Sequence, residues 1–116
     1  MIEFFDKDGR ATAFCDYGKD LYLWDGRPAA VIVDDTVFAY SGRFIGWVED
    51  GWISDARGGR LLFEFDAVGG PVKPSRITKP PMGTRGAKLA KGAREPVPSR
   101  PVRGLAWSET TFAALI

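Results

Sequence analysis

The sequence predicts an all-β fold of four tandem β-hairpin repeats, followed by an extended tail rich in Pro, Gly and basic residues. A Gly-Arg pair occurs four times in residues 1–66, at spacings of 17, 16 and 17 residues. Each pair lies between short runs of apolar, β-prone residues. Every Lys and Arg after residue 72 falls on a single three-residue period. The first two observations predict the hairpins, and the third predicts the tail.

The four pairs mark equivalent positions in four short repeats. They are Gly9-Arg10, Gly26-Arg27, Gly42-Arg43 and Gly59-Arg60. In the first three copies an aromatic residue lies four positions before the glycine: Phe5, Tyr22 and Phe38. A small residue lies four positions after it: Ala13, Ala30 and Gly46. The fourth copy has Asp55 and Phe63 at these positions, so it is the divergent one.

Turn residues separate the strands of each copy. Asp25-Gly26 lies between the apolar runs 21–24 and 28–33, and this dipeptide predicts a type I′ turn with positive φ at both central residues. Ser41-Gly42 has the same place in the third copy. Longer turns are expected in the first and last copies, at residues 7–9 and 57–59. Polar connections join the copies at residues 16–20, 34–35 and 49–51.

Two arrangements of the eight short strands fit this pattern. A closed, pseudo-fourfold arrangement leaves few free strand edges, whereas an open meander of four hairpins leaves two. A domain of this size buries only about 60% of its unfolded surface. We therefore expect the β domain, residues 1–66, to depend on its own tail, on oligomerisation, or on both.

Charge divides the chain into two unlike halves. Residues 1–66 contain seven Lys/Arg and thirteen Asp/Glu, a net −6, and residues 67–116 contain nine and two, a net +7. The basic residues of the tail, residues 67–104, are Lys73, Arg76, Lys79, Arg85, Lys88, Lys91, Arg94, Arg100 and Arg103. A polyproline II helix has three residues per turn, so it would place all of them along one edge. A disordered basic tail is the alternative.

The C-terminal segment, residues 105–116, is apolar with few charges. Ser108 is the expected cap of a short helix that places Phe112 on the same side as Leu115 or Ile116. Together with Trp107 these side chains form a predicted apolar anchor. Because exposed apolar ends are unfavourable, we expect the anchor to dock on its own domain more readily than on another protein.

Composition excludes several kinds of chemistry. The sequence contains no His and one cysteine, Cys15, so imidazole catalysis, an intramolecular disulfide and a multi-cysteine metal site are excluded. Asp6 and Asp8 begin like a calcium loop, but Tyr17 stands where such a loop needs a bidentate Glu. We predict no enzymatic activity, no catalytic or metal site and no cofactor. Without a basic, apolar leader or a membrane-length apolar run, we expect a cytoplasmic protein with no membrane contact.

Three tryptophans are candidate binding residues, because aromatic side chains on related hairpins can form a small-ligand site. They are Trp24, Trp47 and Trp52. Core packing is the simpler interpretation in so small a domain, because aromatic side chains supply much of its apolar burial.

The repeats resemble the bacterial four-fold β-flower domain family. The resemblance rests on residues 4–11, 22–29 and 42–52, and on the entry into the tail at residues 69–74. It is clear over residues 3–75. Beyond them, only the Pro/Arg-rich character of the tail is similar. The resemblance implies the closed pseudo-fourfold fold and no particular activity.

These observations favour a non-enzymatic binding or assembly module in which the basic tail docks on the acidic β domain or on neighbouring copies of the chain. One alternative is polyanion binding, including nucleic acid, through the tail, with affinity that falls steeply with salt. Another is small-ligand binding by the repeat-related aromatics.

Overall fold

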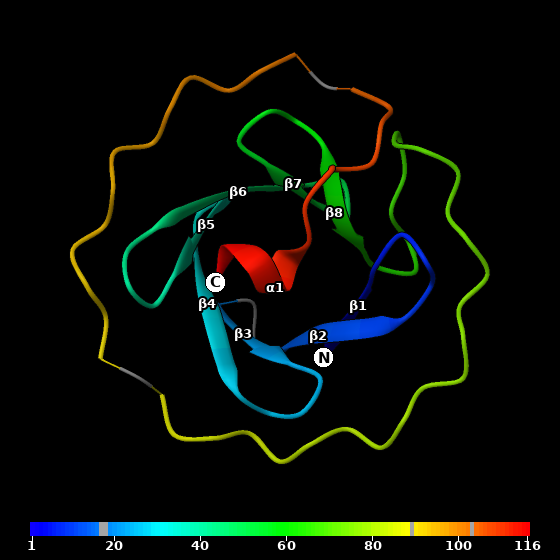
Figure 1. Ribbon diagram of the computed structural model, residues 1–116, viewed down its shortest axis with the longest axis horizontal. Helices are drawn as coiled ribbons and strands as arrows, with labels where there is room; N and C mark the ends of the chain where they lie inside the picture. Colours follow the sequence, from blue (N-terminus) through cyan, green and yellow to red (C-terminus); the bar gives the residue numbers. More distant parts are fainter. Residues whose placement is uncertain (17–18, 89, 103) are drawn as a thin grey trace.

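The computed structural model describes residues 1–16, 19–88, 90–102 and 104–116. Eight antiparallel strands follow one another around a closed barrel (Figure 1). They are β1 (Ile2–Phe5), β2 (Ala11–Asp16), β3 (Asp20–Leu23), β4 (Pro28–Val33), β5 (Thr36–Ala39), β6 (Phe44–Glu49), β7 (Trp52–Asp55) and β8 (Arg60–Phe63). The prediction of four hairpins closed into one all-β ring is confirmed, and the open meander is wrong.

The four hairpin turns share one geometry. In each, a glycine amide donates to the carbonyl three residues earlier: Gly9 to Asp6, Gly26 to Leu23, Gly42 to Ala39 and Gly58 to Asp55. The fourth repeat is therefore aligned by Gly58, one residue before the Gly59-Arg60 pair that the sequence suggested. The first turn comprises residues 7–9, as expected, but all four turns have the same length, so the expected difference between copies is wrong.

Among the described residues, two successive turn residues with positive φ, as in a type I′ turn, occur at one connection between repeats and at none of the turns within them. Gly26 has a φ of 95°, whereas Asp25 is not among the residues with positive φ, so Asp25-Gly26 does not form the predicted turn. Asp50 and Gly51 have φ values of 52° and 85°, and they join β6 to β7. The turns within hairpins instead have three residues that end in a left-handed glycine, the next most common hairpin connection.

A β-bulge lies at the same place in every hairpin. The register shifts at Phe4/Phe5, Leu21/Tyr22, Val37/Phe38 and Ile53/Ser54. Bulges bend a strand and increase its twist, which a small barrel needs in order to close. The strand pairing that closes the barrel is short: among the described residues, one paired position, Phe5 with Phe63, joins β1 to β8.

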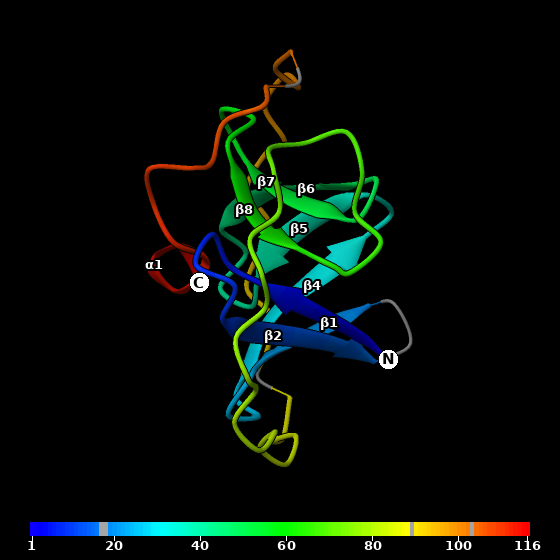
Figure 2. The same ribbon diagram turned by 90° about the vertical axis from the view of Figure 1, so that its right-hand side faces the viewer.

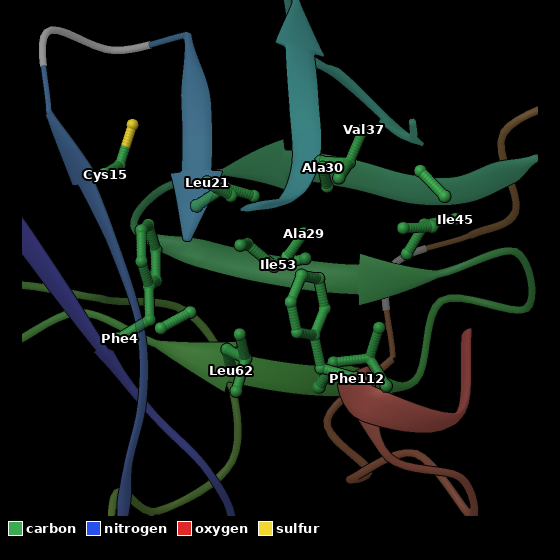
Figure 3. Close-up of a cluster of buried hydrophobic side chains, with 13 residues drawn as sticks. Phe4, Cys15, Leu21, Ala29, Ala30, Val37, Ile45, Ile53, Leu62 and Phe112 are labelled. Carbon is green, nitrogen blue, oxygen red and sulfur yellow. The ribbon is translucent and has the colours of Figure 1, made fainter. Parts of the chain in front are cut away.

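The strands are buried on both faces. Inside the barrel lies one cluster of mostly aliphatic side chains, including Leu21, Val37 and Ile53 (Figure 3). On the outside lie separate aromatic clusters, one of them formed by Phe14, Tyr22 and Trp24. In β8 all four residues are buried. An outer face of this kind has to be covered, and the rest of the chain covers it.

The tail encircles the barrel, and the C-terminal helix lies over the barrel's centre in the same view (Figure 1). A chain as long as residues 67–104 measures ~118 Å at ~3.1 Å per residue. A circle as wide as the molecule's 37 Å long axis has a similar circumference, ~116 Å. The helix α1 (Phe112–Leu115) and the N-terminus lie on opposite sides of the strands (Figure 2). Its N-cap is Thr111, so the expected cap at Ser108 is wrong.

Candidate functional site

The tail passes the four hairpin turns in chain order, once every nine residues. At the first three turns a tail carbonyl oxygen occupies the space where a Cβ of the turn glycine would lie. The oxygens of Ser75, Thr84 and Ala93 lie 2.1, 1.9 and 1.9 Å from the Cβ positions of Gly9, Gly26 and Gly42. At the fourth turn the Val102 oxygen lies 3.3 Å from that of Gly58. These four tail residues are each nine positions apart.

Backbone hydrogen bonds repeat with the same period. Three tail amides donate to turn glycine carbonyls: Ile77 to Gly9 at 2.9 Å, Gly86 to Gly26 at 2.8 Å and Glu95 to Gly42 at 2.8 Å. Two more donate to the first residue of the turn: Gly83 to Trp24 at 2.8 Å and Gly92 to Tyr40 at 2.6 Å. The tail thus satisfies backbone groups that the tips of the hairpins would otherwise leave to water.

Tail cations pair with carboxylates of the barrel. The pairs are Lys79 with Glu3 at 2.8 Å, Arg85 with Asp16 at 2.5 Å, Lys88 with Asp20 at 3.0 Å, and Arg100 with Asp35 and, at 3.8 Å, with Glu49. The basic side chains in these pairs remain 38–59% exposed. Exposed pairs of this kind contribute up to about 1 kcal/mol each, so they orient the tail more than they hold it.

Tail cations also lie over the outer aromatic rings. The pairs are Arg76 with Phe5 at 5.3 Å, Lys79 with Trp24 at 5.9 Å, Arg94 with Phe38 at 5.5 Å and Arg100 with Trp47 at 5.3 Å. Met82, which interrupts the basic series, packs against the cluster of Phe14, Tyr22 and Trp24. The tail therefore covers the outer aromatic face with alkyl stems and flat cationic groups.

Three basic residues of the predicted ridge remain. Lys91 lines a cavity together with Tyr40. The Lys73 ammonium donates to the Phe65 carbonyl at 2.8 Å. Arg103 lies outside the described residues.

Arg60 connects the two ends of the tail. Its side chain is 2% exposed. The guanidinium donates to the carbonyl of Gly69, where the tail begins, at 3.3 Å, and to that of Gly104, where it ends, at 3.2 Å. It also donates to the Ser54 hydroxyl and lies over the Trp52 ring. In the other repeats the Gly-Arg arginines are exposed, so this buried arginine is peculiar to the fourth.

The structure does not gather the three candidate tryptophans into one cavity. Trp24 and Trp52 are buried in different outer clusters. Their indole N–H groups donate to tail carbonyls, those of Pro80 and Val68, each at 2.9 Å. Trp47 is buried beneath Arg100. Each indole is thus engaged by the tail at its own place on the barrel.

The predicted apolar anchor lies at two places on the barrel. Phe112 is buried in the inner cluster, and Leu115 packs against that cluster. Trp107 packs on the outer cluster at 5.5 Å from Trp52, between ring centroids. Ile116 is 38% exposed.

A polar cluster lies where the tail crosses β3 and the end of β5. The Asp20 carboxylate accepts a hydrogen bond from the Tyr40 hydroxyl at 3.0 Å and pairs with the Lys88 ammonium at 3.0 Å. Burial opposes ionisation of Asp20, but the hydrogen bonds from Lys88 and Tyr40, with attraction to Lys88 and Lys91, lower its pKa below 3.8. Burial, followed by the hydrogen bond to Asp20, raises the pKa of Tyr40.

The lowered pKa of Asp20 predicts that the protein loses stability in acid. Because its pKa is lower in the folded chain, the unfolded state binds more protons, so its contribution is full above the unfolded value of 3.8 and is lost as pH falls through the folded pKa. Asp20→Asn should lower the free energy of unfolding by about 1 kcal/mol near pH 7 and flatten its pH dependence below about pH 4. Urea unfolding across this range measures both. Tyr40→Phe should give a smaller effect of the same sign, and an unchanged slope in Asp20→Asn would contradict the prediction.

Among the described residues, no group of three or more His, Cys, Asp or Glu is placed to hold a metal ion. Asp6, from the calcium-like sequence, instead accepts hydrogen bonds from the amides of Asp8 and Arg10 within its turn. In the described part of the chain, no helix has the length and apolarity needed to cross a membrane.

Sequence reasoning missed the nine-residue repeat and the role of Arg60. A signal for the repeat exists: Pro or Gly stands two residues before an arginine at nine-residue steps, at Pro74, Gly83, Gly92 and Pro101, and Pro98 before Arg100 is the one instance in the tail that is out of step. The three-residue spacing of the cations hides it, because nine is a multiple of three. For Arg60 the signal is the doubled glycine, because Arg60 stands two residues after its turn glycine, Gly58, whereas the exposed arginines stand one residue after theirs.

Comparisons with known proteins agree with this architecture. Residues 2–116 match the family described as 4-fold beta flower protein. The match includes the tail and the C-terminal segment, beyond the part where the sequence resemblance is clear. Searches of curated proteins and of solved structures each found no significant match. The chain belongs to the four-fold beta flower protein family.

Proposed function

We propose that this protein is a non-enzymatic binding module whose basic tail docks on its own acidic barrel. One observation carries the proposal: tail backbone meets the hairpin turns in chain order, with a nine-residue step for each repeat of sixteen or seventeen residues. Matched periods of this kind are what docking within one chain requires. The tail then becomes part of the fold and leaves its outward-facing side chains available to ligands.

Hydrogen exchange tests the docking on the full chain. The amides of Ile77, Gly83, Gly86, Gly92 and Glu95, which donate to barrel carbonyls, should exchange slowly. Amides beside them that have no such bond, for example Thr84 and Ala93, should exchange faster. Uniformly fast exchange from residue 73 to 102 would overturn the proposal in favour of a free basic tail.

Gly42→Ala should loosen one arc of the tail. The added methyl would meet the Ala93 carbonyl oxygen at 1.9 Å, and φ at Gly42 is 97°, so we expect about 2 kcal/mol of destabilisation. The Gly92 and Glu95 amides should lose protection first. Gly104→Ala is the matched control, because the nearest atom to its new methyl lies 3.9 Å away. Equal effects of the two substitutions would contradict the close approach at Gly42.

Light scattering at low and high salt distinguishes docking within a chain from exchange between copies. We expect the mass of one chain, 12.7 kDa, at all concentrations. A dimer that grows with concentration would instead indicate that tails dock on neighbouring copies.

A second candidate function is polyanion binding through the tail, favoured by the exposure that its cations retain in their ion pairs. In this case single-stranded DNA or RNA should bind without sequence preference. The affinity should fall by orders of magnitude between about 50 and 200 mM salt. Salt-independent affinity, or none, would count against it.

A further inference from the structure

A cavity of about 740 Å³ lies between the barrel and one arc of the tail. The barrel side of its lining includes Val31, Val33 and Ala39, and the tail side includes Lys88, Lys91 and Arg94. The Gly92 amide donates to the Tyr40 carbonyl at 2.6 Å, which holds this arc against the end of β5. The barrel side thus combines apolar residues with the charged Lys19, Asp20 and Asp34, and it faces a basic tail side.

The charge of the cavity is positive. Four cations and two carboxylates line it, which gives a formal charge of +2. The Asp20 carboxylate is occupied by Tyr40 and Lys88. Among the described residues, neither Lys19 nor Lys91, both in the lining, makes an ion pair. Cationic groups therefore remain for an anion to bind.

The three tail cations occupy successive positions of the three-residue period. In an extended chain with three residues per turn, residues 88, 91 and 94 project from one edge, and all three line the cavity. Arg94 stacks on Phe38 with 5.5 Å between the guanidinium carbon and the ring centroid. Stacking occupies the face of a guanidinium and leaves its in-plane N–H donors for an oxyanion.

The size of the cavity indicates the kind of anion. Small-molecule sites commonly measure about 300–1,000 Å³ and combine apolar walls with a few polar groups. We propose that this cavity binds a small organic oxyanion, a phosphate ester or carboxylate on an apolar body, with Lys91 and Arg94 binding the oxygen atoms. The proposal rests on the docked tail of the proposed function, because the tail forms the basic wall.

The test is a titration of the full chain with phenyl phosphate and with benzoate, followed by calorimetry and by NMR shifts of Tyr40, Val31 and Ala39. At least one probe should bind saturably with a Kd of about 1 mM or tighter. The stronger of the two identifies the oxyanion. Benzyl alcohol, which lacks the charge, and inorganic phosphate, which lacks the apolar body, should each bind at least about tenfold more weakly.

Two double variants decide the site. Lys91→Gln with Arg94→Gln should weaken binding at least about tenfold. Lys73→Gln with Arg76→Gln removes two cations from the corresponding positions of the tail, where Arg76 stacks on Phe5 as Arg94 stacks on Phe38. This control should change the affinity by less than about twofold.

The outcomes separate the two proposals. Equal weakening in both variants, inorganic phosphate binding as tightly as phenyl phosphate, or no saturable binding while the Gly92 amide stays protected would each overturn the cavity as a site and leave the docked tail standing. Fast exchange of the Gly92 amide would overturn both.

Discussion

Phe112→Ala should lower the free energy of unfolding by about 3–5 kcal/mol, the usual cost of removing a buried aromatic ring. Phe112 is 2% exposed, and its ring points from α1 into the inner cluster of the barrel (Figure 3). An isolated helix of four residues is unstable in water, so packing of this ring has to hold α1 in place. Without the ring, the interior of the barrel would open to water.

Urea unfolding followed by tryptophan fluorescence measures the Phe112 effect. Ile116→Ala is the control, because Ile116 is 38% exposed at the same end of the chain, and its effect should be within about 0.5 kcal/mol. Wild-type stability of Phe112→Ala would show that the barrel does not depend on its C-terminal helix.

The hairpin repeat could be predicted because its signal is local. A turn needs glycine at one fixed position, and the recurrence of Gly-Arg gave the number of hairpins and their order. The fourth copy was aligned one residue too late, because Gly58 and Gly59 are adjacent and the pair with arginine was the more visible. Its turn is in fact at Gly58, with a φ of 86°.

The turn types could not be read from dipeptides alone. Asp25-Gly26 and Asp50-Gly51 both have the sequence favoured by type I′ turns, and only the second forms one. The difference comes from the bulge that each hairpin carries near its turn, such as the shift between Leu21 and Tyr22. The bulge adds a residue to one strand, and a three-residue turn fits that register.

The path of the tail depended on long-range contacts that periodicity did not disclose. The three-residue spacing predicted a one-edged row of cations, but it did not indicate that Ser75, Thr84 and Ala93 would approach the turns through their backbone. These contacts require a glycine on the barrel and a carbonyl on the tail, and neither depends on the charge that drew attention to the tail.

The candidate site likewise came from the fold. The cavity beside Tyr40 combines strand residues near positions 31 and 40 with tail residues near position 91, and nothing in the sequence links these segments. The tryptophans, which composition made conspicuous, donate to the tail or lie beneath it. In a barrel buried on both faces, most of the buried aromatic side chains belong to the outer clusters, and Phe4 and Phe112 belong to the inner one.

Arg60→Met should lower the free energy of unfolding by about 3 kcal/mol, because methionine keeps the alkyl stem and removes every donor. The carbonyls of Gly69 and Gly104 and the hydroxyl of Ser54 would lose the guanidinium that they share. Both ends of the tail should loosen together, since one side chain holds them.

Arg57→Met is the matched control, because Arg57 is exposed near the same turn, and its effect should be within about 0.5 kcal/mol. Urea unfolding gives the free energies, and hydrogen exchange locates the change. The amide of Ser108, which donates to the Arg60 carbonyl at 2.8 Å, should lose protection in Arg60→Met and keep it in Arg57→Met.

If Arg60→Met unfolds like the wild type, the tail is held by its contacts at the turns alone. If it loosens only the Gly104 end, the two ends are held independently. Loss at both ends would establish Arg60 as the residue that closes the ring around a barrel in which, in the part of the chain that the structure describes, one pair, Phe5 with Phe63, joins β1 to β8.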